Sequence, residues 1–102
     1  PLVSAVIPAF NKADFIRDTI LSVLSQSYEN IEILIANDGG TDSTPDVVRG
    51  ILQQNPNRKI HYYEKINGGV SDTRNFLIER ALGRLILIID ADDLADPSFV
   101  KK

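Results

Sequence analysis

The 102-residue sequence contains no cysteine, which excludes a disulfide, a thiolate nucleophile and a zinc–thiolate site. It also contains no methionine, so residue 1 is not a translation start and we expect the chain to be a fragment of a larger domain. No apolar run approaches the ~18 residues that a membrane span requires. The N-terminus lacks the charged region, apolar stretch and cleavage site of a signal peptide.

Positive charge is in slight deficit, with 11 Lys and Arg against 14 Asp and Glu and a net charge of -3. This argues against a nucleic-acid partner, which would require a basic surface. It does not exclude a phosphorylated small molecule, because a divalent cation can supply positive charge locally. The hydrophobic fraction of 43% is typical of a globular chain, and the length predicts a single domain over residues 1–102.

Four short apolar runs predict β-strands, at 3–7, 31–36, 60–63 and 85–89. The second and fourth are nearly continuous, as expected of strands that are covered on both faces. Strands that recur every ~25–30 residues with helices between them indicate βαβ units. The predicted fold class is therefore α/β and Rossmann-like, with a mostly parallel sheet and helices on both faces.

Apolar residues at helical spacing predict helices between these strands. They form three groups: Ile16, Ile20, Val23 and Leu24; Val47, Val48, Ile51 and Leu52; and Val70, Leu77, Ile78 and Ala81. Thr44–Pro45 suits the start of the second helix, and Asp96–Pro97 suits the start of a fourth. Gly83 suits the end of the third.

Small polar, acidic and glycine residues follow every predicted strand, at 8–11, 37–40, 67–69 and 90–93. In a parallel sheet these four segments all lie at the carboxyl edge, where open α/β folds bind ligands. Their convergence is a stronger signal than any one of them.

The acidic segment Asp90-Ala91-Asp92-Asp93 follows a buried strand directly. Two carboxylates ~4 Å apart repel by about 4 kcal/mol at an effective dielectric near 20, so a cation would relieve the cluster. Oxygen ligands favour Mg²⁺ or Mn²⁺. The alternative is an acidic turn in which Asp92 or Asp93 caps a helix, and composition alone does not separate the two.

Two other segments offer polar groups. Asp38, before two glycines, suits hydrogen bonds to a ribose or a base N–H, or else an ordinary turn. The glycines Gly68 and Gly69 open a helix that carries Arg74, and such an N-terminus can hold an anion. His61, the single histidine, is expected to have a structural or surface role.

Five segments together resemble glycosyltransferase family 2. They are residues 3–11, 22–33, the Asn-Asp-Gly-Gly-Thr-Asp-Ser-Thr of 37–44, the Gly-Gly-Val-Ser-x-x-Arg-Asn of 68–75, and the Ile-Asp-Ala-Asp-Asp of 89–93. They come in family order and at family spacing, and they cover nearly the whole chain. Two positions depart from the family pattern: Asn37 and Gly40 replace the commoner Asp and Ser.

The resemblance implies a GT-A fold and inverting transfer of a sugar from a nucleoside-diphosphate donor, with Mg²⁺ or Mn²⁺. Asp38 would contact the base, commonly uracil, and Arg74 would lie near the diphosphate. Asp92 would ligate the metal, with Asp90 contributing to it or to the sugar. The donor site as a whole is expected at Pro8, Ala9, Phe10, Asn11, Asp38, Gly68, Gly69, Arg74, Asp90 and Ala91.

The family's catalytic base lies beyond the Asp-x-Asp motif, so we expect it beyond residue 102 and expect this chain to bind the donor without transferring it. The acceptor, whether saccharide, lipid or protein, is left open. A nucleotidyltransferase of similar fold and a non-catalytic nucleotide-binding domain are the alternatives. We expect a cytoplasmic location, with attachment to a membrane through other segments left open, and self-association through exposed apolar surface.

Overall fold

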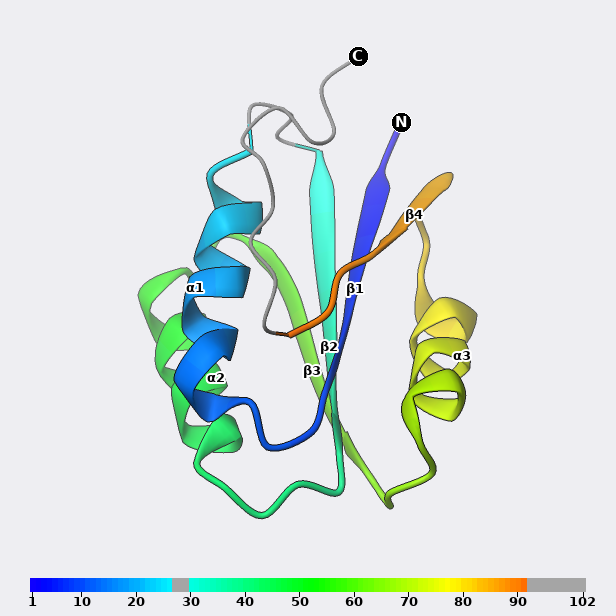
Figure 1. The fold of residues 1–102 in the computed structure, drawn as a ribbon. Coiled ribbons are helices and arrows are strands. Elements are labelled where there is room, and N and C mark those ends of the chain that lie inside the picture. Colours follow the sequence, from blue (N-terminus) through cyan, green and yellow to red (C-terminus); the bar gives the residue numbers. More distant parts are fainter. Residues whose placement is uncertain (27–29, 92–102) are drawn as a thin grey trace.

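The structure is a computed structural model, and it describes residues 1–26 and 30–91. Figure 1 shows strands and helices alternating along this part of the chain. The elements are β1 (Val3–Ala9), α1 (Ala13–Leu24), β2 (Ile31–Asp38), α2 (Thr44–Gln54), β3 (Lys59–Lys65), α3 (Val70–Arg80) and β4 (Leu85–Ile88). None of the helices in the described ranges is long and apolar enough to cross a membrane.

The sheet is parallel throughout, with strand order β3-β2-β1-β4. β1 lies between β2 and β4, with its register running from Val3 opposite Ile31 to Ala9 opposite Asn37. α1 and α2 cover one face of the sheet and α3 covers the other (Figure 1). The predicted parallel sheet with helices on both faces is therefore confirmed. The chain reverses its direction of winding at β1, which places a switch point between β1 and β4.

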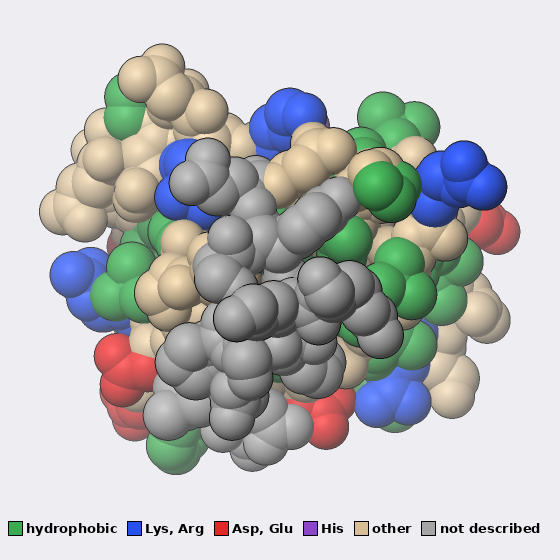
Figure 2. Space-filling view, turned by 90° about the horizontal axis from the view of Figure 1, so that it is seen from above, with side chains coloured by type: hydrophobic (Ala, Val, Ile, Leu, Met, Phe, Trp, Pro, Cys, Tyr) green, Lys and Arg blue, Asp and Glu red, His purple; other side chains and the backbone are tan. Residues whose placement is uncertain are grey.

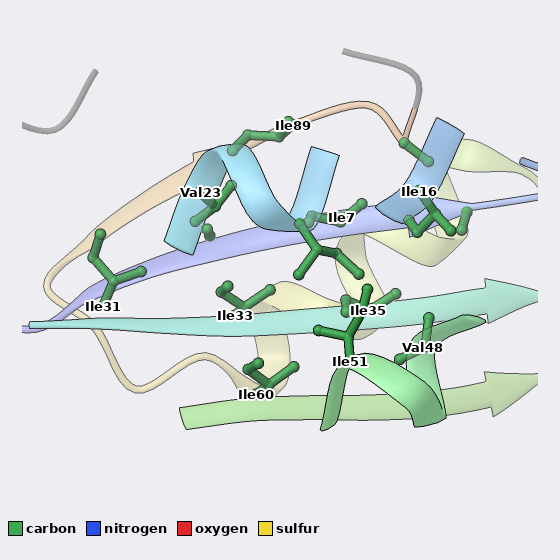
Figure 3. Close-up of a cluster of buried hydrophobic side chains, with 14 of the residues drawn as sticks. Ile7, Ile16, Val23, Ile31, Ile33, Ile35, Val48, Ile51, Ile60 and Ile89 are labelled. Atoms are coloured by element: carbon green, nitrogen blue, oxygen red, sulfur yellow. The ribbon is translucent and has the colours of Figure 1, made fainter. Parts of the chain in front are cut away.

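The larger core lies between the sheet and the pair α1 and α2 (Figure 3). Side chains alternate along each strand, so Ile7 enters this core while its neighbour Val6 packs against α3. The helices contribute Ile16, Ile20, Val23, Val48 and Ile51, which are all fully or almost fully buried. Each such side chain contributes about 1.5–3 kcal/mol by leaving water. The predicted helical spacing thus identified the buried faces of α1 and α2.

The third helix and the fourth strand differ from expectation. Val70 is 52% exposed, contrary to the prediction, whereas Leu77 is buried as predicted and packs on the sheet together with Thr73. β4 was expected to be covered on both faces, but it is an edge strand with Leu85 and Ile88 exposed in the described structure. A continuous apolar run indicates a buried strand, yet it does not reveal how many neighbours that strand has.

A buried polar network lies at the amino end of the strands. Ser4 Oγ donates to Glu32 Oε2 at 2.5 Å, and the Leu82 N–H donates to the same oxygen at 2.7 Å. The Gly83 N–H donates to Ser4 Oγ at 2.8 Å, and a Cβ on Gly83 would lie 2.7 Å from the Ser4 nitrogen. Gly83 is therefore needed for close approach to β1. It does not end α3, which stops at Arg80.

Exposed apolar side chains lie on one side of this end of the molecule. Figure 2 looks onto it, and hydrophobic side chains gather on the side where α3 and β4 lie. The exposed apolar residues of this region include Leu82, Leu85 and Ile78.

At the opposite end, Ser43 rather than Thr44 holds the N-cap position of α2, and Pro45 follows in the first turn as expected. Asp96–Pro97 lies outside the described residues.

Candidate nucleotide-binding site

A pocket of about 420 Å³ opens at the carboxyl edge of the sheet, beside the switch point between β1 and β4. Open α/β sheets bind ligands at such points. Residues at or just after the carboxyl ends of all four strands contribute to its wall, because parallel strands end at the same edge. The lining residues are Pro8, Ala9, Phe10, Lys12, Asp38, Asn67, Gly69, Val70, Thr73, Asp90 and Ala91.

Asp38, the last residue of β2, is 4% exposed and accepts several hydrogen bonds. Its Oδ1 accepts from Lys65 Nζ and from the Gly68 N–H, both at 2.9 Å, and its Oδ2 accepts from the Gly69 N–H at 3.1 Å. Burial alone would raise the pKa of Asp38. The hydrogen bonds from Lys65 and Gly68 outweigh burial and hold the pKa below 3.8, so the carboxylate is charged at neutral pH.

The N-terminus of α3 therefore already has an anion beside it. The amides of Gly68 and Gly69, which we expected to be open to a ligand, donate to the Asp38 carboxylate instead. Asn67 Nδ2 adds a bond to the Asp38 carbonyl at 3.0 Å. The glycines thus shape the pocket by fixing Asp38, and Gly69 lines the pocket as well.

Lys65, the last residue of β3, was not among the predicted site residues. Its ammonium contacts Asp38 at 2.9 Å, Asp72 Oδ2 at 2.7 Å and the Ile66 carbonyl at 2.8 Å. The hydrogen bonds to Asp72 and Asp38 raise the pKa of Lys65 above 10.5. Lys65 and Asp38 face each other in the register of β2 and β3. The sequence did offer one signal for Lys65: its charge is opposite to that of Asp38, and it stands at the end of the next predicted strand.

Asn11 joins two loops rather than facing the pocket. Its Oδ1 accepts from the Thr41 N–H at 2.8 Å and the Asp42 N–H at 3.3 Å, and its backbone has a φ of 52°. Asp42 forms a second link between the same two loops, because its Oδ2 accepts a hydrogen bond from the Ala13 N–H at 2.9 Å. Asn11 therefore ties the loop after β1 to the loop after β2.

The two departures from the family pattern fit each other in this loop. Asn37 Oδ1 accepts from the Gly40 N–H at 3.1 Å. A Cβ on Gly40 would lie 2.8 Å from Asn11 Oδ1 and 2.9 Å from Asn37 Oδ1, which is closer than a carbon and an oxygen approach. A serine in place of Gly40 would have to move one of these two side chains.

Arg74, on α3, pairs with Asp90, which follows β4. Arg74 Nη2 lies 3.2 Å from Asp90 Oδ1. Arg74 Nε is buried without a hydrogen-bond partner in the described part of the chain, and such an atom is costly unless a ligand satisfies it. Arg74 does not itself line the pocket, but its partner Asp90 does.

The expected metal ligand Asp92, like Asp93, lies outside the described residues. Within residues 1–26 and 30–91, no group of three His, Cys, Asp or Glu side chains could hold a metal. Asp90 supplies one half-exposed carboxylate at the pocket wall. One or two carboxylates together with substrate phosphates form a common Mg²⁺ site, so this donor fits a metal that arrives with a diphosphate.

Comparison with known families agrees with this arrangement. The family model described as Glycosyl transferase family 2 matches residues 4–102. The chain belongs to this family. It is 37% identical over 101 residues to the chondroitin synthase of Pasteurella multocida strain Pm70, covering 99% of this chain and 10% of that protein.

Two solved structures share the fold of this family 2 chain. The mannosyltransferase PcManGT of Pyrobaculum calidifontis, in complex with GDP-Man and Mn²⁺, superposes with a TM-score of 0.89 at 26% identity, over 97% of this chain and 29% of that one. S. aureus TarS 1-349 in complex with UDP superposes with a TM-score of 0.87 at 23% identity, over 99% of this chain and 30% of that one. The fold is that of GT-A glycosyltransferases, and the chain spans less than a third of these proteins.

The pocket of this glycosyltransferase family 2 chain brings together most of the predicted donor-site residues. Pro8, Ala9, Phe10, Asp38, Gly69, Asp90 and Ala91 line it. Asn11, Gly68 and Arg74 lie behind the lining, where they contact other site residues. Prediction missed Lys12, Asn67, Val70 and Thr73 as lining residues. His61 is half exposed on β3, with Nε2 3.8 Å from Glu32 at the other end of the sheet.

Proposed function

We propose that this chain binds the nucleotide of a nucleoside-diphosphate sugar, with UDP preferred, as the donor site of a longer glycosyltransferase. The observation that carries the proposal is the pocket beside the switch point, which is lined by residues at or just after the carboxyl ends of all four strands. Those segments carry the motifs of the family to which the chain belongs. The complexes of PcManGT with GDP-Man and of TarS with UDP support a nucleotide ligand.

The residues divide into a base end and a phosphate end. Asp38, with its charged carboxylate, would accept a hydrogen bond from a base N–H, and Pro8 and Phe10 offer apolar surface to the base. Across the pocket, Arg74 would donate its unpaired Nε–H to the diphosphate. Asp38 lines the pocket, and Arg74 lies behind its wall with a buried Nε that no described residue satisfies.

Asp90 and Asp92 would hold Mg²⁺ or Mn²⁺ together with the phosphates. When bound, the metal would neutralise charge that develops on the departing diphosphate. Asp90 is paired with Arg74 in the structure, which supports assigning both groups to the diphosphate.

We further propose that the whole enzyme inverts configuration and takes its base from outside this chain. Inversion by a single displacement needs a base that removes the proton of the acceptor hydroxyl. Asp38 is fully occupied with internal bonds and a base contact, and Asp90 is assigned to the phosphate end. The 102-residue chain is therefore expected to bind the donor without transferring the sugar.

Isothermal titration calorimetry of the chain with UDP tests this function. We expect binding in the presence of Mn²⁺, weaker binding after chelation, and weaker binding of GDP than of UDP. Asp38→Ala should weaken the binding of UDP. Asp46→Ala, a matched change at an exposed residue of α2, should leave it unchanged. Folded protein that binds neither UDP nor GDP at saturating Mn²⁺ would overturn the proposal.

A further inference from the structure

We propose that Lys65 is a positioning residue that sets the nucleotide specificity of the pocket by limiting Asp38 to one free acceptor position. The inference rests on the proposed function and extends it to a residue behind the pocket. Lys65 is itself absent from the lining. It acts through Asp38 and does not touch the ligand.

The argument begins with a count of acceptor positions. An ionised carboxylate has about four, two on each oxygen. Lys65 and Gly68 occupy both positions on Asp38 Oδ1, and Gly69 occupies one on Oδ2. The Thr73 hydroxyl also hydrogen-bonds Asp38 and lowers its pKa, but its single hydrogen can turn to the Gly69 carbonyl at 2.9 Å and so release that position to a ligand. One position on Oδ2 is therefore left for a ligand.

The position of Lys65 is fixed on all sides. An ammonium has three hydrogens, and here they point to Asp38, Asp72 and the Ile66 carbonyl, at 2.7–2.9 Å. The side chain is only 11% exposed, so water competes weakly for these contacts. Lys65 thereby links the ends of β2 and β3 to the first turn of α3, which is the frame that holds Asp38.

A single acceptor position distinguishes between nucleobases. Uracil offers one ring N–H between two carbonyl groups, which one carboxylate oxygen can accept. Guanine offers two adjacent donors, a ring N–H and an amino group, and these pair best with both oxygens of a carboxylate. Because Oδ1 is occupied, the second guanine donor would remain unpaired in a desolvated site, and that is costly. The arrangement therefore favours UDP over GDP.

Lys65 also controls the charge of Asp38. The charged groups around Asp38 are Lys65 from β3 and Asp72 from α3, and Lys12 and Asp90 line the same pocket. Burial raises the pKa of Asp38, and Lys65 is the foremost group that lowers it. Without Lys65, the pKa of Asp38 would rise, and the carboxylate would lose its charge at a higher pH than in the wild type.

The test compares Lys65→Met with Lys59→Met, which removes the same charge at the exposed start of the same strand. Calorimetry gives Kd for UDP and GDP with Mn²⁺ between about pH 5 and pH 8. Since both nucleotides carry the same diphosphate, the ratio of their Kd values reports base recognition. We expect Lys65→Met to weaken the binding of UDP by about tenfold and to bring the ratio of the Kd values for UDP and GDP closer to one. The binding of UDP to this variant should weaken further toward acidic pH. Lys59→Met should behave as wild type.

The outcomes separate the two proposals. Wild-type protein that binds neither nucleotide overturns the proposed function, and the role of Lys65 with it. An unchanged ratio and an unchanged pH profile in Lys65→Met overturn the role of Lys65 alone, even where both nucleotides bind more weakly. If Lys65→Met does not fold, Asp72→Asn replaces it, because Asp72 is largely exposed and anchors Lys65. The Asp72→Asn variant should bring the ratio of the Kd values for UDP and GDP about twofold closer to one. An unchanged ratio overturns the proposal.

Discussion

Arg74 and Asp90 meet across the pocket wall, with Arg74 Nη2 3.2 Å from Asp90 Oδ1. Both side chains are partly exposed, so the ion pair adds less than about 1 kcal/mol to stability. The buried Nε of Arg74 has no partner in the described residues, which makes a phosphate oxygen a suitable acceptor. We therefore expect the pair to serve ligand binding more than stability.

Arg74→Ala should accordingly weaken UDP binding by about ten- to a hundredfold, through loss of a hydrogen bond between charged groups. It should leave the binding of uridine, which has no phosphate, unchanged in NMR titrations. Arg84→Ala, at an exposed arginine, is the control. Equal weakening of UDP and uridine would place Arg74 away from the diphosphate.

Asp92→Ala is expected to remove the dependence of UDP binding on Mn²⁺. The variant would lose one of the two carboxylates assigned to the metal, and the phosphates alone hold a divalent cation weakly. Calorimetry with UDP at increasing Mn²⁺ measures this directly. Persistence of the wild-type response to Mn²⁺ would assign the metal to other ligands.

Gly40→Ser should destabilise the fold by about 1–3 kcal/mol, because the new Cβ would overlap Asn11 Oδ1 and Asn37 Oδ1. Gly50→Ala is the matched control: it lies in α2 with open space around it, and the change should stabilise by about 0.5–1 kcal/mol. Urea denaturation gives both values. A Gly40→Ser protein as stable as wild type would show that the loop relaxes without cost.

Acid should destabilise the chain through Asp42. Burial raises the pKa of Asp42, but hydrogen bonds from Thr44 and Ala13 outweigh it and hold the pKa below 3.8. A pKa that is lower in the folded state gives stability above about pH 4, and this stability is lost as the pH falls through the folded value. Asp42→Asn should flatten that part of the acid-unfolding curve, whereas Asp46→Asn should not. An unchanged curve for Asp42→Asn would contradict the assignment.

We also expect the chain to self-associate as its concentration rises. β4 is an edge strand in the described structure; Leu85 within it and Leu82 just before it are exposed. Unprotected edges and apolar patches favour pairing between chains. Leu85→Lys should reduce association in sedimentation velocity experiments. A wild-type monomer at all concentrations would show that this edge does not pair.

The sequence was sufficient for the parallel sheet and for the convergence of its loops, because apolar periodicity and the order of polar segments depend only on local pattern. It was insufficient for features that depend on neighbours. Lys65 becomes important through its register with Asp38, and periodicity does not reveal register. Asn11 looked like a ligand contact until its side-chain oxygen proved to be occupied by Thr41 and Asp42.

The central claim is that the pocket beside β1 and β4 binds the nucleotide of a sugar donor. NMR spectra of ¹⁵N-labelled chain, titrated with UDP and Mg²⁺, test it most directly. We predict that the amide signals that shift are those of the pocket wall, including Ala9, Asp38, Gly69 and Ala91. Saturating UDP that shifts none of these signals, or shifts only amides at the amino end of the strands, would contradict it.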